Sequence, residues 1–209
     1  MSARQQLHRY LGECPLVAIV RGVKPTEAEA IGEAVAEAGI RIIEVPLNSP
    51  DPLKSIELLA RRLGDSMLVG AGTVLSSEEV ERVRSCGGRI IVSPDTNPEV
   101  VAAAAAAGLV SSPGYFTPSE AFAAIRAGAD ALKLFPAEGA SPASLKAQLA
   151  VIPREIPVLA VGGITPDNMR PWLEAGAAGF GLGSGLYKPG QSAAETLTKA
   201  RAYVAGVRM

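Results

Sequence analysis

A repeated unit limits what this chain can fold into. Short apolar runs alternate with alanine-rich amphipathic stretches along its 209 residues, and each run suits a strand buried in a parallel sheet. The eight runs are LVAIVRG, IRIIEVPL, MLVGAGTV, RIIVSPD, LVSSPG, ALKLFP, PVLAVGG and AGFGLGS. No Pro-, Gly- or Ser-rich linker separates the units. We therefore expect one domain, 1–209, folded as a (β/α)8 TIM barrel with a short N-terminal helix from about Arg4 to Leu11.

The expected helix boundaries repeat one chemistry. A capping side chain followed by proline predicts five helix starts, at Ser49, Asn97, Thr117, Ser141 and Thr165. Capping-box spacing occurs at Thr26 with Glu29, Ser76 with Glu79 and Thr117 with Glu120. Glycines in EAGI, CGGR, AAGL, RAGA and EAGA predict left-handed helix ends. A doubly wound sheet is the alternative fold, but the units continue evenly to the C-terminus and no GxGxxG follows the first strand.

Charge and hydropathy exclude several classes of function. Twenty Lys and Arg against 21 Asp and Glu give a net charge of −1, so no basic face for nucleic acid is expected. The longest apolar run, 100–110, is too short to span a bilayer. The first residues lack the apolar core of a secretory signal, and Cys14 and Cys86 show neither CxxC nor metal-ligand spacing. We expect a cytoplasmic protein that binds neither nucleic acid nor membrane.

Two charged residues occupy strand positions that should face the barrel interior. Lys133 shares a strand face with Ala131 and Phe135 in ALKLFP, and Glu44 is placed in the same way in RIIEVPL. Burying either charge without a partner is costly. An ion pair between them is one explanation, but buried ion pairs add little net stability. We therefore expect Lys133 and Glu44 to be catalytic.

A buried lysine favours carbonyl chemistry. Desolvation and a neighbouring cation, Arg21 at the end of the first run, both favour the neutral, nucleophilic amine. Such an amine attacks a ketone, and the resulting iminium allows a nearby carbon–carbon bond to break while Glu44 moves protons. The only histidine is His8, so a histidine-rich metal centre is not available, although a magnesium site of carboxylates stays open. We expect neither a metal nor a cofactor.

Glycine-rich turns follow the seventh and eighth runs. Gly162 and Gly163, and then Gly183 and Ser184, stand where TIM barrels usually bind phosphate through backbone amides. Tight turns without a ligand would have the same sequence. Thr73 offers a hydroxyl at the same end of the barrel and is equally compatible with a structural role.

Together these motifs resemble a known family, the class I 2-keto-3-deoxy-6-phosphogluconate and 6-phosphogalactonate aldolases. The similarity spans nearly the whole chain, through IVRG, EVPLNSP, GAGTV, SPGYFTPSEA, ALKLFPA, AVGGITPDN and GLGSGLY. The resemblance implies that Lys133 forms the Schiff base and Glu44 carries protons. It also implies a homotrimer. The substrate-binding residues that it implies are Arg21 and Thr73 for the pyruvate-derived end, and Gly162, Gly163, Gly183 and Ser184 for the phosphate.

Two positions bear on which sugar acid is cleaved. Gluconate-type members typically have an arginine four residues after the catalytic glutamate and a threonine before the glycine pair, whereas this chain has Asn48 and Val161. With Val161 in the substrate site, the resemblance implies cleavage of 2-dehydro-3-deoxy-6-phosphogalactonate to pyruvate and D-glyceraldehyde 3-phosphate. The alternative is gluconate-type or 4-hydroxy-2-oxoglutarate aldolase activity. An epimerase-type phosphate barrel, or a barrel that only binds phosphosugars, would leave Lys133 unexplained.

Overall fold

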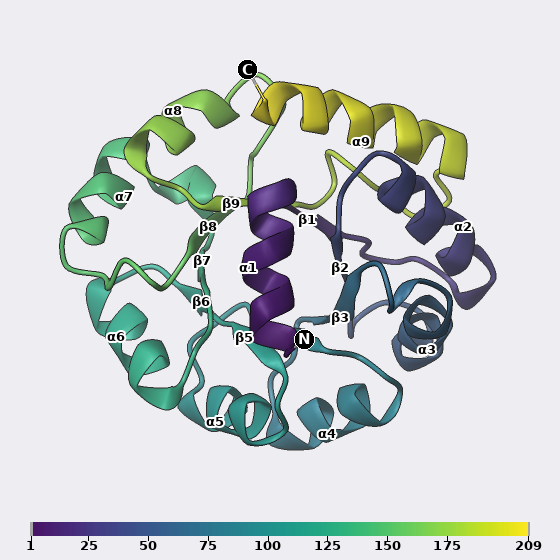
Figure 1. Ribbon diagram of the computed structural model, residues 1–209, viewed down its shortest axis with the longest axis horizontal. Coiled ribbons are helices and arrows are strands. Elements are labelled where there is room, and N and C mark those ends of the chain that lie inside the picture. Colours follow the sequence, from purple (N-terminus) through teal and green to yellow (C-terminus); the bar gives the residue numbers. More distant parts are fainter. Residues whose placement is uncertain (1, 209) are drawn as a thin grey trace.

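The computed structural model describes residues 2–208 as a ring of parallel strands enclosed by helices (Figure 1). This is the expected (β/α)8 barrel with an N-terminal helix. Its strands are β1 (Leu16–Ile19), β2 (Ile42–Pro46), β3 (Leu68–Gly72), β4 (Ile90–Val92), β5 (Val110–Ser112), β6 (Gly114–Tyr115), β7 (Leu132–Leu134), β8 (Val158–Val161) and β9 (Gly179–Leu182). Its helices are α1 (Ala3–Glu13), α2 (Pro25–Glu37), α3 (Pro52–Leu63), α4 (Ser77–Ser85), α5 (Pro98–Ala106), α6 (Pro118–Ala127), the 3-10 helix η1 (Ala137–Gly139), α7 (Pro142–Leu149), α8 (Met169–Ala175) and α9 (Ala193–Val207).

The fifth strand of the barrel is divided in two by a proline. Pro113, which has no N–H to donate, separates β5 from β6. The neighbouring β7 bonds across this break, because the amide of Lys133 donates to the carbonyl of Pro113 at 2.9 Å. The amide of Phe135 donates to the carbonyl of Tyr115 at 3.1 Å, and β4 pairs with β5 on the other side. The nine strand segments therefore fill the eight barrel positions that the sequence repeat predicts.

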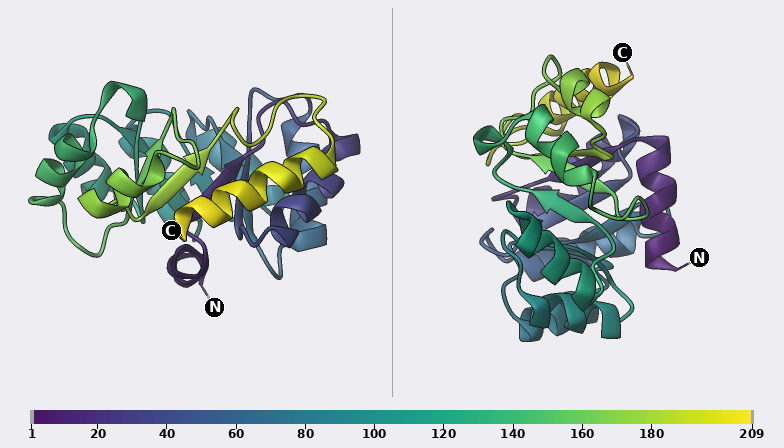
Figure 2. Two further views of the ribbon diagram at one scale, coloured as in Figure 1. Left: turned by 90° about the horizontal axis from the view of Figure 1, so that it is seen from above. Right: turned by 90° about the vertical axis from the view of Figure 1, so that its left-hand side faces the viewer.

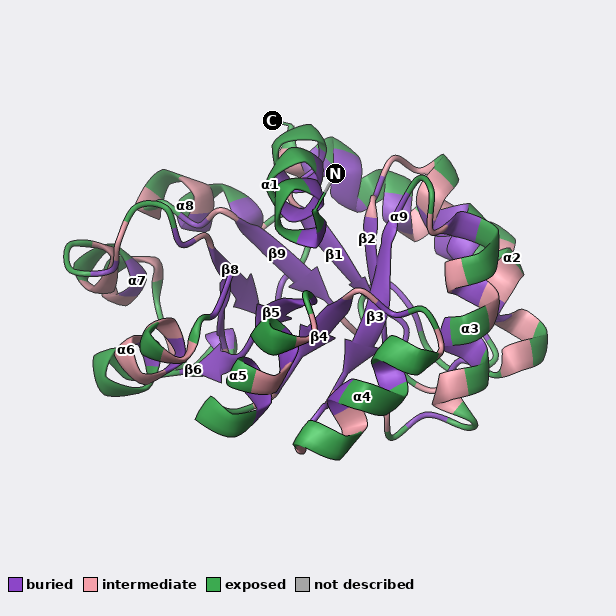
Figure 3. Ribbon diagram, turned by 60° about the horizontal axis from the view of Figure 1, so that its bottom comes forward, coloured by how far each residue is buried: buried purple, intermediate pink, exposed green. Residues whose placement is uncertain are grey.

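The strands are buried on both faces (Figure 3), as expected where a parallel sheet is covered by helices. The outer faces pack against the helices, and the inner faces form a smaller apolar cluster. The strand residues of that inner cluster are Val17, Ile19, Ile42, Leu68, Ile90, Val92, Val110, Ala131, Leu159 and Val161. Because side chains alternate along a strand, Glu44 continues the inner row of Ile42, and Lys133 continues that of Ala131.

Helix α1 closes one end of the barrel. It lies across the ring in Figure 1 and on one face of the molecule in Figure 2. Leu7, which is fully buried, and Leu11 belong to the same apolar cluster as the inner strand faces. Since α1 leads through Cys14 and Pro15 directly into β1, it covers the amino-terminal ends of the strands. The carboxyl-terminal ends, where barrel enzymes carry their chemistry, lie opposite.

Most predicted helix boundaries are confirmed. Asn97, Thr117 and Ser141 are N-caps of α5, α6 and α7, and Thr117 forms its capping box with Glu120. Ser76 caps α4 by accepting from the amide of Glu79. The glycines at the five predicted helix ends all have positive φ: Gly39, Gly87, Gly108, Gly128 and Gly176. Among residues 2–208, no helix has the length and apolarity needed to cross a membrane.

Two predictions near the first helices were wrong. Helix α3 begins at Pro52 rather than after Ser49, because the Ser49 hydroxyl accepts a hydrogen bond at 2.9 Å from the amide of Gly22. That bond joins the loops after β1 and β2 at the barrel mouth. Thr26 is not a cap either, since α2 already begins at Pro25, whose fixed φ suits the first helical position.

The predicted helix start at Thr165 was also wrong. Helix α8 begins only at Met169. The side chain of Asn168 accepts from the amide of Thr165 at 2.9 Å and donates to the carbonyl of Gly163 at 2.7 Å. These two bonds close a loop over residues 163–168, and so the backbone turns before it becomes helical.

Candidate active site

Lys133 extends from the middle of β7 into the barrel. It is only 7% exposed, and its Nζ lies 4.4 Å from the centre of the Phe135 ring. Burial lowers the pKa of Lys133; the carboxyl of Glu44 opposes this shift, and the guanidinium of Arg21 adds to it. A lowered pKa makes the neutral, nucleophilic amine available closer to neutral pH.

Glu44 enters the same interior from β2. It is 2% exposed, and Gly72 on the adjacent β3 leaves room for its carboxyl, since a Cβ there would lie 2.0 Å from Oε2. Burial raises the pKa of Glu44 to about 7, even though Lys133 and Arg21 both act to lower it. A carboxyl with this pKa can both accept and donate a proton near neutral pH.

Arg21 stands at the barrel mouth, just after β1. Its guanidinium donates to Oδ1 of Asn48 and, at 3.4 Å, to Oγ1 of Thr73. These contacts tie it to the loops after β2 and β3. Thr73 has a positive φ of 57°, which is unusual for a β-branched residue, and such backbone strain concentrates at functional sites. A guanidinium held in this way can bind a carboxylate through paired hydrogen bonds.

Two loops with free backbone amides, after β8 and β9, also line the mouth, and β9 is paired directly with β1. Gly162 and Gly163 after β8 have φ values of 112° and 63°, which glycine adopts most easily. Within residues 2–208, no hydrogen bond uses the amides of Gly163, Ile164, Ser184 or Gly185. Clustered free amides of this kind bind anions such as phosphate.

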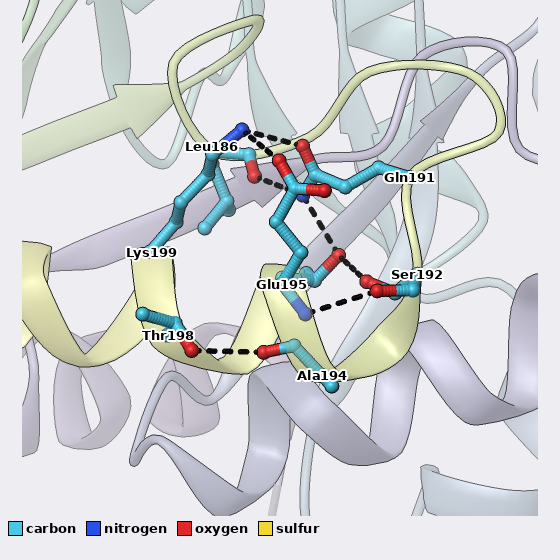
Figure 4. A network of polar contacts seen from close by, with 8 residues as sticks. Leu186, Gln191, Ser192, Ala194, Glu195, Thr198 and Lys199 are labelled. Carbon is cyan, nitrogen blue, oxygen red and sulfur yellow. Dashed lines mark hydrogen bonds and ion pairs between the residues drawn. The ribbon is translucent and has the colours of Figure 1, made fainter.

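A polar network, buried at Gln191 and Thr196 and exposed at Glu195, supports the loop after β9 (Figure 4). Nε2 of Gln191 donates to the carbonyl of Leu186 at 2.7 Å and to Oγ1 of Thr196 at 2.9 Å. Lys199 on α9 donates to Oε1 of Gln191 at 2.7 Å and pairs with Glu195 at 2.8 Å. The network fixes the loop to the first turns of α9, and so it fixes the free amides just upstream.

Nearly all the predicted site residues meet in one cleft of about 340 Å³. Those lining the cleft are Arg21, Thr73, Lys133, Val161, Gly162, Gly163, Gly183 and Ser184. Glu44 lies deeper and lines an inner pocket, which Lys133 and Val161 also border. Lys133 therefore borders both the cleft and the inner pocket.

Three further polar residues line these spaces and were not predicted as site residues; one is Thr165, in the loop after β8. Ser112 borders the inner pocket, and alternation from Val110 would have placed it inside the barrel. Glu138 borders the cleft, and its carboxylate packs against the glycine loop, since a Cβ on Gly162 would lie 2.0 Å from its Oε2. Its direction depends on η1, which no sequence pattern indicated.

A larger hollow lies on the outside of the protein. It measures about 880 Å³, lies between α3 and α4, and has a lining of mixed charge that includes Arg61, Arg82, Glu57 and Glu81. None of the predicted site residues contributes to it. In the described part of the chain, residues 2–208, no three His, Cys, Asp or Glu side chains gather closely enough to hold a metal ion.

Fold and site together define an enzyme of the (β/α)8-barrel class, with a lysine and a carboxyl below a mouth lined by free backbone amides. The sequence model of one family, KDPG and KHG aldolase, matches residues 7–200. The chain belongs to this family, and it is an aldolase, a carbon–carbon lyase.

Individual relatives agree with the family assignment. The chain is 48% identical to the probable 2-dehydro-3-deoxy-6-phosphogalactonate aldolase of Rhizobium meliloti (strain 1021) over 193 residues, which are 92% of this chain and 91% of that one. It is 46% identical to the 2-dehydro-3-deoxy-6-phosphogalactonate aldolase of Escherichia coli (strain K12), over 93% of this chain and 95% of that one. A solved structure described as native KDPGal superposes with a TM-score of 0.91 at 46% identity, over 93% of this chain and 94% of that one.

Proposed function

We propose that this aldolase cleaves 2-dehydro-3-deoxy-6-phosphogalactonate into pyruvate and D-glyceraldehyde 3-phosphate through a Schiff base on Lys133. The observation that carries the proposal is the buried amine of Lys133, with its lowered pKa, on a side chain that borders both the cleft and the inner pocket. The names of the relatives with 46–48% identity support the substrate. Asn48 and Val161, which match the galactonate type, support it as well.

The proposed reaction uses Lys133 as the nucleophile and Glu44 as the proton carrier. The neutral amine of Lys133 adds to the C2 ketone, and Glu44 relays protons so that water leaves and a protonated imine forms. A base then takes the proton of the C4 hydroxyl. The C3–C4 bond breaks, and its electron pair moves into an enamine that neutralises the imine nitrogen. The aldehyde leaves, the enamine takes a proton at C3, and water releases pyruvate and the free amine.

The remaining residues bind the two charged ends of the substrate. Arg21 and Thr73 hold the carboxylate next to the ketone, because the guanidinium and the hydroxyl contact each other and line the same cleft as Lys133. Gly162 and Gly163, with Gly183 and Ser184, hold the phosphate. The unused amides at these loops, which line the same cleft as Lys133, support that orientation.

Reductive trapping tests the proposal. Incubation with pyruvate and borohydride should add a reduced pyruvate group to the chain, and peptide mass spectrometry should locate it on Lys133. Lys133→Arg keeps a charge but supplies no primary amine, so it should give no adduct and no aldol cleavage. An adduct on another lysine, or cleavage activity in the arginine variant, would overturn the proposal.

The choice of epimer is tested separately. The rate constant kcat/KM should favour 2-dehydro-3-deoxy-6-phosphogalactonate over its gluconate epimer by about tenfold, because one differing hydroxyl contact amounts to 1 to 3 kcal/mol. Side-by-side kinetics on the two substrates measures this ratio. A ratio of one, or a reversed preference, would remove the galactonate assignment while leaving the aldolase chemistry untouched.

We also infer that the chain assembles as a homotrimer and acts in the cytoplasm. The family resemblance supports the trimer, and mass photometry at micromolar concentration tests it. Cys14 and Cys86 are both free thiols, which fits a reducing compartment.

A further inference from the structure

Glu138 lines the cleft, and the proposed reaction does not use it. It lies in η1, which follows β7, the strand that carries Lys133. Its side chain packs against the loop after β8, because a Cβ added to Gly163 would lie 2.6 Å from its Cγ and a Cβ added to Gly162 would clash with its carboxylate. The carboxylate therefore lies against the loop that is proposed to bind the phosphate.

The carboxylate of Glu138 is exposed and is not used by another protein group. Within residues 2–208, it forms no ion pair, and no side chain or backbone amide donates a hydrogen bond to it. An ionised carboxylate can only accept hydrogen bonds, so it cannot donate one to a phosphate group, and the two like charges repel each other. The substrate group that Glu138 can bind is therefore an uncharged hydrogen-bond donor.

The other polar side chains of the cleft already have partners in the proposed reaction. Among residues 2–208, six polar side chains line the cleft, those of Arg21, Thr73, Lys133, Glu138, Thr165 and Ser184. The first three are assigned to the carboxylate and the ketone of the substrate, and the last two lie in the loops assigned to its phosphate. Between these ends the substrate carries hydroxyl groups on C4 and C5. The C5 hydroxyl is next to the carbon that bears the phosphate, and so it belongs to the end of the substrate near Glu138.

We propose that Glu138 is a specificity-determining residue whose carboxylate accepts a hydrogen bond from the C5 hydroxyl of the substrate. The inference rests on the proposed function, which places the ketone at Lys133 and the phosphate at the glycine loops. In the aldehyde product, the same hydroxyl is on C2 of D-glyceraldehyde 3-phosphate. A hydrogen bond to an ionised acceptor is stronger than one between neutral groups. Glu138 therefore favours aldehydes that carry this hydroxyl over aldehydes that lack it.

The reverse reaction provides the test, because the aldehyde can then be varied alone. Pyruvate is condensed either with D-glyceraldehyde 3-phosphate or with 3-oxopropyl phosphate, which has the same chain length and phosphate but no hydroxyl. The enamine on Lys133 forms a bond to the aldehyde carbon, and the aldehyde oxygen takes a proton. The ratio of kcat/KM for the two aldehydes, at saturating pyruvate, isolates the hydroxyl contact, since their difference in reactivity is the same for every variant.

Glu138→Ala should lower this ratio by about tenfold, because only the aldehyde with the hydroxyl loses a hydrogen bond. Glu138→Gln keeps an acceptor oxygen of the same reach and should lower the ratio by less than about threefold. The glutamine variant also tests the inference if the alanine variant does not fold, since it should then preserve the preference that wild type shows.

Asp167→Ala is the matched control. Asp167 is another exposed carboxylate in the loop after β8, but it does not line the cleft, so the ratio should keep its wild-type value. An unchanged ratio in Glu138→Ala would overturn the inference, as would a lower KM for both aldehydes, which indicates repulsion of the phosphate alone. A loss of preference in Glu138→Gln or in Asp167→Ala as large as that expected for Glu138→Ala would overturn it too. Wild type that forms no borohydride adduct with pyruvate would instead reject the proposed function, so the two failures are distinguishable.

Discussion

Lys133 and Glu44 depart from their ordinary pKa values in opposite directions. The pKa of Lys133 is lowered and that of Glu44 is raised to about 7, in both cases chiefly by burial. Each group is therefore closer to giving up its charge than it would be in water. Proton transfer is efficient when the pKa of the catalytic group lies near the working pH. Burial in the same interior thus lowers the pKa of the nucleophile, Lys133, and raises the pKa of the proton carrier, Glu44.

The buried carboxyl has a measurable effect on stability. The pKa of Glu44 is about 7 in the folded protein against an ordinary 4.5, so the native state binds this proton more tightly than the unfolded chain does. The resulting stabilisation is complete below pH 4.5 and is lost as the pH rises through about 7. Between these limits, the free energy of unfolding of wild type should fall by about 3 kcal/mol relative to Glu44→Gln.

Urea unfolding of both proteins at several pH values checks this prediction. The glutamine variant should also lose about a hundredfold in kcat, because it cannot move protons. If the free energies of unfolding of wild type and Glu44→Gln change with pH in the same way, the raised pKa of the Glu44 carboxyl is contradicted. Full activity in the variant would show that Glu44 is not the proton carrier.

Residue positions on strands could be predicted from the sequence, whereas loop contacts could not. Strand alternation placed Lys133 and Glu44 inside the barrel, and the same rule applied to Val110 indicates Ser112. The contact between Arg21 and Asn48 depends on how two loops bend toward each other. The position of Glu138 likewise depends on the 3-10 helix η1. Neither the bend of the two loops nor this short helix produces a repeating pattern of apolar residues in the sequence.

At the scale of elements, capping chemistry predicted helix starts only where the capping side chain was free to cap. Asn97, Thr117 and Ser141 cap their own helices. Ser49 does not, because its hydroxyl accepts from a neighbouring loop, and Thr165 does not, because Asn168 closes the loop ahead of it. Local sequence cannot reveal these competing partners, since they become neighbours only when the barrel forms.

The loop after β9 depends on Gln191, and its removal should weaken phosphate binding. Gln191→Leu leaves the carbonyl of Leu186 and the ammonium of Lys199 without this amide partner, which should lower the free energy of unfolding by about 1–3 kcal/mol. The KM for the phosphorylated substrate should rise severalfold. Trapping of pyruvate, which has no phosphate, should proceed at the wild-type rate.

A neighbouring threonine on α9 is the control for this variant. The hydroxyl of Thr198 donates only to the carbonyl of Ala194, on its own helix and at the surface (Figure 4). Thr198→Ala should therefore change stability by less than about 0.5 kcal/mol and leave KM unaltered. Equal KM values for the Gln191 and Thr198 variants would show that the network does not support substrate binding.

At the scale of the whole molecule, the α1 residues that stabilise the barrel and the residues of the candidate active site lie at opposite ends of the barrel. Leu7→Ala should lower the free energy of unfolding by about 2–5 kcal/mol, because it opens a cavity beneath the inner cluster. The value of kcat/KM at 25 °C should stay within about twofold of wild type while the protein remains folded.

His8, the exposed neighbour of Leu7 on α1, provides the comparison. His8→Ala should leave both the unfolding midpoint and the kinetics near wild type, since exposed substitutions rarely exceed about 0.5 kcal/mol. Thermal unfolding and steady-state kinetics check both variants. A large loss of kcat in Leu7→Ala at a temperature where it is fully folded would contradict the separation of the two ends.

Helix α1 covers the amino-terminal ends of the barrel strands, on the side opposite the cleft. The substrate therefore enters, and both products leave, through the cleft at the opposite end. Under the proposed reaction, D-glyceraldehyde 3-phosphate is bound near the mouth by its phosphate and leaves first. Pyruvate, which is covalently bound to Lys133 deeper in the barrel, leaves second. Product order then follows from the covalent bond to Lys133, because the pyruvate fragment stays attached until water hydrolyses the imine.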